Sequence, residues 1–222
     1  MTVAAWGLRL GLGVVGLASS SCASEPAGAA ITANLQIAPV VEDHPWVIAF
    51  LTELGSERPA GVDARLEGRS VPDGRYFGEP IFEGQRRELL AELLATYEAA
   101  HVRPPELAVV WEHSPGRRDD LDWRLHFVDR SAGFAVDSDA RVILEPRDSL
   151  VLLRFGASQR ERFAALSGAH VGQRLAFTID DETLMIPVIH SSITGGQIQL
   201  TPNSEGDPKL TAQALVDRLT AP

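Results

Sequence analysis

Histidines and clustered carboxylates are the residues of this 222-residue chain that could bind a metal ion. The six histidines show neither an H-E-x-x-H motif nor another short zinc-binding spacing. Asp119, Asp120 and Asp122 are close in sequence, but they lack the residue order and the distant glutamate of a calcium-binding loop. A solvated loop is the favoured interpretation of these aspartates. We therefore predict no metal site and no cofactor.

Acid–base catalysis has two candidate groups, Glu112-His113 and Asp180-Asp181-Glu182. The second group falls in a predicted hairpin turn, and no G-x-S-x-G elbow presents a serine nucleophile. The sequence therefore favours a non-catalytic protein. An envelope hydrolase built on the same scaffold and a purely structural component of an envelope complex are the alternatives.

The single cysteine, Cys22, excludes an intrachain disulfide and a cysteine-based zinc cluster. It follows a cation at Arg9, an apolar stretch over 10–18 and the serines at 19–21. This order is typical of a secretory signal, and the apolar stretch is shorter than the roughly 20 residues that span a bilayer. We predict a signal peptide over 1–21, and a retained membrane helix is the less favoured reading.

The sequence before Cys22 resembles the lipobox of bacterial lipoproteins, in which the cysteine becomes the lipidated N-terminus. The usual leucine three residues before the cysteine is displaced here to Leu17, so ordinary signal-peptidase cleavage remains the alternative. The two or three acyl chains of a bacterial lipoprotein anchor it stably to a membrane, whereas a single chain binds the membrane only marginally. Ala23 replaces the aspartate that retains some lipoproteins in the inner membrane. We expect a lipid anchor facing the periplasm, with the outer membrane slightly favoured.

The charge balance excludes a nucleic-acid partner. Thirty acidic residues stand against 20 basic residues, giving a net charge of −10, so the chain lacks a basic surface for phosphates. No later apolar run approaches the length of a membrane-spanning helix. We expect the mature protein to be anchored or soluble and not to span the membrane.

The remaining sequence divides into three predicted parts. Residues 22–34 are rich in small residues and read as a flexible tether. Residues 35–133 form an N-terminal α+β region, in which the apolar periodicity over 85–101 predicts a helix. Residues 134–222 form a second α+β unit. The whole is predicted to be α+β, with a mostly antiparallel sheet and helices on one face.

Short sequence motifs in the second unit predict where its helices begin and where two of its strands pair. Ser158 and Glu161 fit a capping box at the start of a helix. Strands over 174–179 and 184–189 flank a polar turn and predict a hairpin, and a final helix begins at 207–208.

Pro187 lies inside the second predicted strand, where proline indicates a sheet edge or a bulge. Simple edge protection is one interpretation, and addition of an extended peptide to that edge is the other. We take Pro187, Ile189 and Ile193 as candidate polypeptide-binding residues. Gly195 and Gly196 lack a phosphate-binding pattern and are interpreted as a structural turn, with a ligand cradle as the alternative.

The segment from Val151 to Leu219 resembles the head subdomain of the first periplasmic domain of SecD and SecDF. A helix with a phenylalanine, a G-x-x-L-A strand, a P-x-I strand and an I-T-G-G segment occur in the family's order. The matching positions are Phe163, Leu166, Gly172, Leu175, Ala176, Pro187, Ile189, Ile193, Gly195 and Gly196.

The resemblance implies a ferredoxin-like periplasmic module that contacts unfolded polypeptide or Sec and envelope proteins. SecD and SecDF couple proton flow to movement through membrane-spanning helices, and this sequence has no comparable segments. We therefore expect a polypeptide- or partner-binding module linked to protein export rather than a proton-driven motor.

Overall fold

The computed structural model describes residues 28–221, except 58, 71–75, 114–119, 146–149 and 201–207. Cys22, the predicted signal peptide, Asp119 and the predicted cap at residue 207 lie outside the described residues. The helices are α1 (Pro45–Glu57), α2 (Arg87–Ala100), α3 (Ala157–Ala169) and α4 (Pro208–Thr220). The strands are β1 (Ala29–Ala30), β2 (Leu35–Pro39), β3 (Val62–Ser70), β4 (Tyr76–Gly84), β5 (Leu107–His113), β6 (Trp123–Asp129), β7 (Phe134–Ala135), β8 (Arg141–Glu145), β9 (Leu150–Arg154), β10 (Leu175–Ile179), β11 (Glu182–Met185) and β12 (Gln197–Leu200).

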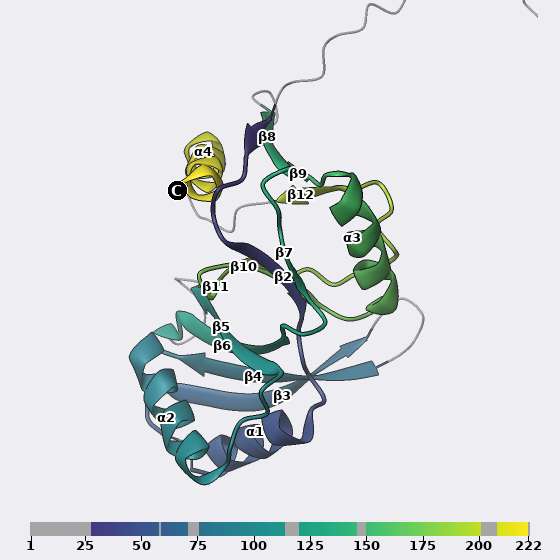
Figure 1. The fold of residues 1–222 in the computed structure, drawn as a ribbon. Helices are drawn as coiled ribbons and strands as arrows, with labels where there is room; N and C mark the ends of the chain where they lie inside the picture. Colours follow the sequence, from purple (N-terminus) through teal and green to yellow (C-terminus); the bar gives the residue numbers. More distant parts are fainter. Residues whose placement is uncertain are drawn as a thin grey trace, which may run out of the picture.

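The strands form two sheets. The smaller sheet has the order β1-β8-β9-β12 and is antiparallel throughout. The larger sheet has the order β3-β4-β6-β5-β11-β10-β2-β7, and within it only β11 and β5 run parallel. Figure 1 shows α1 and α2 below the larger sheet, with α3 and α4 beside the smaller one.

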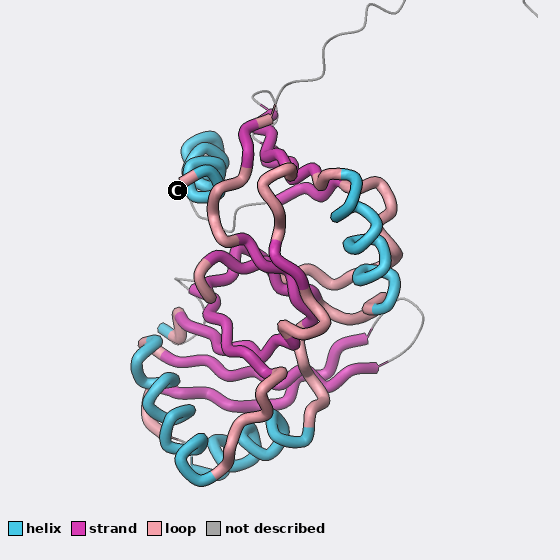
Figure 2. Tube along the Cα trace, in the orientation of Figure 1, coloured by secondary structure: helices cyan, strands magenta, loops and turns pink. Residues whose placement is uncertain are grey.

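Part of the larger sheet closes into a ring. After β2, Val40 forms an antiparallel bridge with Val128 of β6, and the Val41 N–H donates to the Phe127 carbonyl at 2.8 Å. The strands β6, β5, β11, β10 and β2 therefore return to their starting point (Figure 2). Small and β-branched side chains fill the apolar part of the interior. These are Ala38, Val40, Val110, Val128 and Ala176, with Ala108 and Ile186 packed against them.

Two larger cores lie on either side of the ring. Phe50 of α1 stacks on Phe82 of β4 and contacts Tyr97 of α2, with ring centroids 5.1 and 5.0 Å apart. These rings form the core beneath α1 and α2. The second core contains Phe163 of α3 and Phe177 of β10, whose centroids are 6.2 Å apart. Apolar burial on this scale is the main stabilising term in a domain of this size.

The predicted α+β fold with mostly antiparallel sheets is confirmed. The helix predicted over 85–101 is α2, and the predicted hairpin is β10–β11. The predicted capping box at Ser158 was wrong, because the N-cap of α3 is Gly156, two residues earlier, and it has no side-chain cap bond. A Cβ at Gly156 would overlap the carboxylate of Asp139, so a neighbour distant in sequence leaves room only for glycine at this N-cap. Among the described helices, none has the length and hydrophobicity needed to cross a bilayer.

The division between 35–133 and 134–222 remains a prediction, and one strand crosses it. β2 pairs with β10 along its whole length, from Leu35 opposite Ile179 to Pro39 opposite Leu175. Leu35 and Ile37 are buried in the same core as Phe177. The second unit therefore takes part of its sheet and core from the first.

We expect a 134–222 fragment alone to lack a cooperative thermal transition, because β10 would lose its β2 neighbour. Removing two buried aliphatic side chains from a core costs about 2–5 kcal/mol each, comparable to the stability of a small domain. A synthetic peptide covering 28–42 should restore the transition, measured by circular dichroism, and the same peptide with Ile37→Asp should not. Cooperative melting of the fragment without peptide, at the temperature of the full chain, would contradict this.

Candidate functional site

An apolar groove of about 340 Å³ lies between β12 and the segment that follows β11. Its walls include Met185, Pro187, Ile189, Ile193 and Ile198. Ile189 is buried and supports the floor, whereas Pro187 and Ile193 are half-buried and accessible. The volume is at the lower end of ligand-binding pockets. The structure thus brings the three predicted polypeptide-binding residues to one concave surface, and their role stays a prediction.

The β10–β11 hairpin positions one wall of the groove. Its turn places Asp180 and Asp181 at φ 49° and 67°, the left-handed backbone of a type I′ turn. Ile179 then pairs directly with Glu182. A two-residue turn of this type matches the twist of the strands and fixes their register. The register shifts by one residue between Thr178 and Phe177, so Phe177 lies opposite Met185, and both side chains line the groove.

Pro187 lies just after β11 rather than inside a regular strand, because the regular pairing ends at Met185. Its carbonyl accepts from the Leu175 N–H at 3.1 Å, and the Ile189 N–H donates to the Gln173 carbonyl at 2.8 Å. Proline cannot donate to a ladder, so an irregular extension of the hairpin suits it. The segment is held on one side by β10 and its preceding residues, with its other side toward the groove.

Hydrogen bonds to α3 hold the far end of the groove. The buried Ser167 hydroxyl donates to the Phe163 carbonyl at 2.7 Å and accepts from the Ile193 N–H at 2.9 Å. Ser192 donates to the Ala164 carbonyl at 3.0 Å. These contacts fix Ile193 against the helix, where its side chain completes the wall.

A turn over 194–196 leads from this anchor into β12. Gly196 has φ +64°, and a Cβ there would collide with the Arg160 side chain. The backbone therefore requires glycine at this position. Gly195 has no atom near the position of a Cβ, so it is not sterically constrained in the same way.

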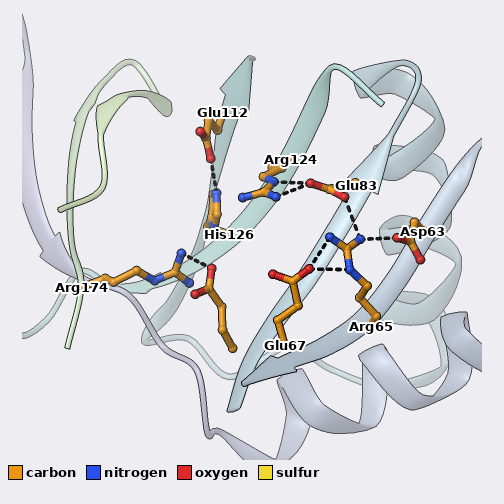
Figure 3. A network of polar contacts seen from close by, with 9 residues as sticks. Asp63, Arg65, Glu67, Glu83, Glu112, Arg124, His126 and Arg174 are labelled. Atoms are coloured by element: carbon orange, nitrogen blue, oxygen red, sulfur yellow. Dashed lines mark hydrogen bonds and ion pairs between the residues drawn. The ribbon is translucent and has the colours of Figure 1, made fainter. Parts of the chain in front are cut away.

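A cluster of charged residues lies across the adjacent larger sheet (Figure 3). His126 is buried and lies 2.9 Å from Glu112 through Nε2. On one side Arg174 contacts Glu42 at 2.6 Å and Glu79 at 2.5 Å. On the other side Arg124 binds Glu83.

The cluster continues beyond Arg124. Glu83 also accepts from Arg65 at 2.7 Å, and Arg65 contacts Asp63 and Glu67 as well. Buried charges are tolerated only when they are paired in this way. The cluster therefore specifies how β4, β6 and the residue before β10 are placed relative to one another.

Two groups of the cluster, His126 and Glu83, have lowered pKa values. Burial lowers the pKa of His126 below its ordinary value; the charges of Arg174 and Arg124 act in the same direction, and Glu112 opposes them. Burial alone would raise the pKa of Glu83, but hydrogen bonds from Arg65 and Arg124 outweigh it, so that the pKa is lowered. His126 is accordingly harder to protonate in the folded protein than a histidine exposed to water.

A second cavity, of about 320 Å³, lies between β5, β11 and α4 and contains carboxylates. Glu112 is turned toward His126, and Glu182 pairs with Arg218 at 2.9 Å and Arg87 at 3.6 Å. His113 stacks on Trp123 with centroids 4.5 Å apart and is not paired with Glu112. The acid–base pair Glu112-His113 is therefore not assembled. In the described part of the chain, no group of three histidine, cysteine, aspartate or glutamate residues could hold a metal ion.

Several residues of the groove were missed by sequence reasoning. For Met185 and Ile198 the sequence indicates only that they lie in strands. It does not indicate that they line the same groove as Pro187. Ser167 had one available signal, since a serine on the buried face of a helix is expected to bond a carbonyl or a neighbouring segment. The His126–Glu112 pair joins opposing strands, so it depends on a register that the sequence does not state.

The groove lies in the part of the chain that matches a known family. A family model described as SecDF, P1 head subdomain, matches residues 136–216. Residues 136–216 resemble the SecDF P1 head subdomain. The predicted resemblance is thereby confirmed for this part of the chain.

Solved structures similar to the chain are also SecDF proteins. A SecDF in a super-membrane-facing form is 17% identical, with a TM-score of 0.30, and the match covers 88% of this chain and 30% of that one. SecDF from Thermus thermophilus is 16% identical, with a TM-score of 0.33, and the match covers 87% of this chain and 30% of that one. A structure described as a membrane component SecDF that enhances protein export is 16% identical, with a TM-score of 0.30. That match covers 83% of this chain and 92% of the other. This chain spans 30% of the length of the first of these proteins. No curated protein matches it.

We expect the free energy of unfolding to decrease as the pH falls below about 6.5. The unfolded state binds a proton at His126 near that ordinary pKa, whereas the folded state resists it, so the unfolded state gains up to about 1.4 kcal/mol per pH unit. His126→Gln should flatten this part of the profile, measured by urea unfolding at a series of pH values. Above that window the two profiles should run parallel. If the wild-type and His126→Gln profiles ran parallel throughout the acidic range, His126 would not be the group that causes the loss of stability.

Proposed function

We propose that this protein is a non-catalytic bacterial lipoprotein that binds extended polypeptide through its SecDF-like head, in connection with protein export. The observation that carries the proposal is the apolar groove over Pro187, Ile189 and Ile193. It lies within the residues that match the head subdomain. A concave apolar surface beside a sheet edge suits unfolded chains, whose apolar side chains are exposed.

The location proposed for the head is the periplasm, on the outer face of the inner membrane or the inner face of the outer membrane. The motivating features are the signal-like segment before Cys22 and the periplasmic location of the SecDF head. The outer membrane is favoured by Ala23. Proteins emerging from the export machinery are unfolded there, which supports a link between the groove and export.

The non-catalytic assignment is supported by the partners of the acidic groups. Glu112 faces the buried His126, and Glu182 is neutralised by two arginines. The groove itself is lined mainly by apolar side chains and amides. This chemistry favours reversible contact with apolar segments over proton transfer or nucleophilic attack.

The groove is tested by replacing Ile193 with asparagine. The substitution places a polar group on the apolar wall and should weaken binding of a permanently unfolded secretory protein about tenfold, corresponding to about 1.4 kcal/mol of lost apolar contact. Val102→Asn is the matched control, because Val102 is 89% exposed and lies outside the groove. Binding is measured by fluorescence anisotropy. Equal affinities of the two variants and wild type would count against the groove.

The anchor is tested separately in cells. With a palmitate analogue, the wild-type protein should be labelled and fractionate with membranes, because several acyl chains give stable attachment. Cys22→Ala should abolish labelling and release the protein, and Ser21→Ala serves as the matched control. An unlabelled wild-type protein, or a Cys22→Ala variant that still fractionates with membranes, would reject lipidation.

A further inference from the structure

The exposed edges of the two sheets differ in their protection. Within the described residues, the edge strands are β1 and β12 of the smaller sheet and β3 and β7 of the larger one. β1 and β7 are each two residues long, which leaves little backbone for pairing. Short edges of this kind are a common protection against unwanted strand addition.

β3 is longer and is protected by charge. It carries Asp63, Arg65 and Glu67 at alternate positions, and Arg65 forms ion pairs with both acidic neighbours. A strand added beside β3 would have to accommodate these charged side chains.

β12 has neither form of protection. Its sequence is Gln-Ile-Gln-Leu, with neither a charged residue nor proline, and it pairs with β9 alone among the described strands. The side chains of Gln197 and Gln199 are exposed.

The hydrogen-bond pattern shows which backbone groups of β12 face the outer edge. The Phe155 N–H donates to the Gly196 carbonyl at 2.8 Å, so these two residues form a bonded pair. Bonded and non-bonded pairs alternate along an antiparallel ladder. Ile198 and Leu200 therefore bond to β9, and Gln197 and Gln199 direct their N–H and C=O groups to the outer edge.

The groove described above borders this edge. Gln197, Ile198 and Gln199 all line it, together with Pro187 and Ile193. Side chains of a strand paired with β12 would alternate between its two faces. Those on the face of Ile198 would enter the apolar groove, while the others would lie beside the exposed glutamines.

We infer that a bound polypeptide adds to β12 as a further strand, with its backbone bonded to Gln197 and Gln199 and every second side chain in the groove. This inference rests on the proposed function and specifies its mode of binding. It assigns the partner as a segment in extended conformation with apolar residues at alternate positions. Recognition then depends on backbone and spacing rather than on one particular sequence.

The test uses the full-length protein and a short peptide of alternating valine and serine, made with and without N-methylation. Methylating an amide that faces β12 removes one donor and should weaken binding about tenfold, and methylating the next amide along should have little effect. The amide protons of Gln197 and Gln199 should become protected from hydrogen exchange when the peptide binds. Gln199→Pro should weaken binding similarly, with Gln199→Ala as the control that keeps the N–H; thermal melting reports whether each variant folds.

The outcomes separate the two proposals. Alternating sensitivity to methylation, with protection of both glutamine amides, supports strand addition. Binding that is insensitive to methylation at every position rejects strand addition and leaves the groove function standing. No binding of the peptide or of unfolded secretory protein rejects both. Dimerisation through β12, detected by sedimentation and lost in Gln199→Pro, rejects a polypeptide as the occupant of this edge.

Discussion

The pairing of β2 with β10 is the contact on which the rest of the fold depends. β2 lies near the start of the described structure, and β10 follows it by well over a hundred residues, yet the two strands pair along five residues. The chain then continues past Pro39 and bridges Val40 to β6. One segment thereby closes the ring of strands and contributes Leu35 and Ile37 to the core beneath the groove.

Closing the ring creates an interior that is apolar in one part and charged in another. Ala38 and Val40 fill the apolar part, whereas Arg174, the residue before β10, binds Glu42 and Glu79 beside it. Such buried ion pairs contribute little net stability compared with apolar packing, but removal of one partner leaves an uncompensated charge. They therefore penalise alternative registers of β2 and β10, and a correct register is what places Phe177 and Met185 under the groove.

Sequence reasoning succeeded where structure is decided locally. The β10–β11 hairpin was predictable because Asp180 and Asp181 tolerate the left-handed conformation that a two-residue turn requires. The helix α2 was predictable because its apolar residues recur with helical period. The start of α3 was not predictable, since its N-cap glycine, Gly156, lies against Asp139 only after the chain has folded. The ring closure and the His126–Glu112 pair were likewise hidden, because both follow from long-range register.

The candidate site shows the same division between local and long-range information. Pro187 signalled an interrupted strand, and Gly196 signalled a turn, but neither indicated that the two segments face each other across a groove. That arrangement requires Ser167, which bonds Ile193 to α3 while β12 returns to pair with β9. The groove is therefore held by a helix, a hairpin extension and an edge strand, each anchored independently. An edge strand supported from one side only can pair with an incoming chain without displacing a native neighbour, so binding there would leave the two cores and the ring intact.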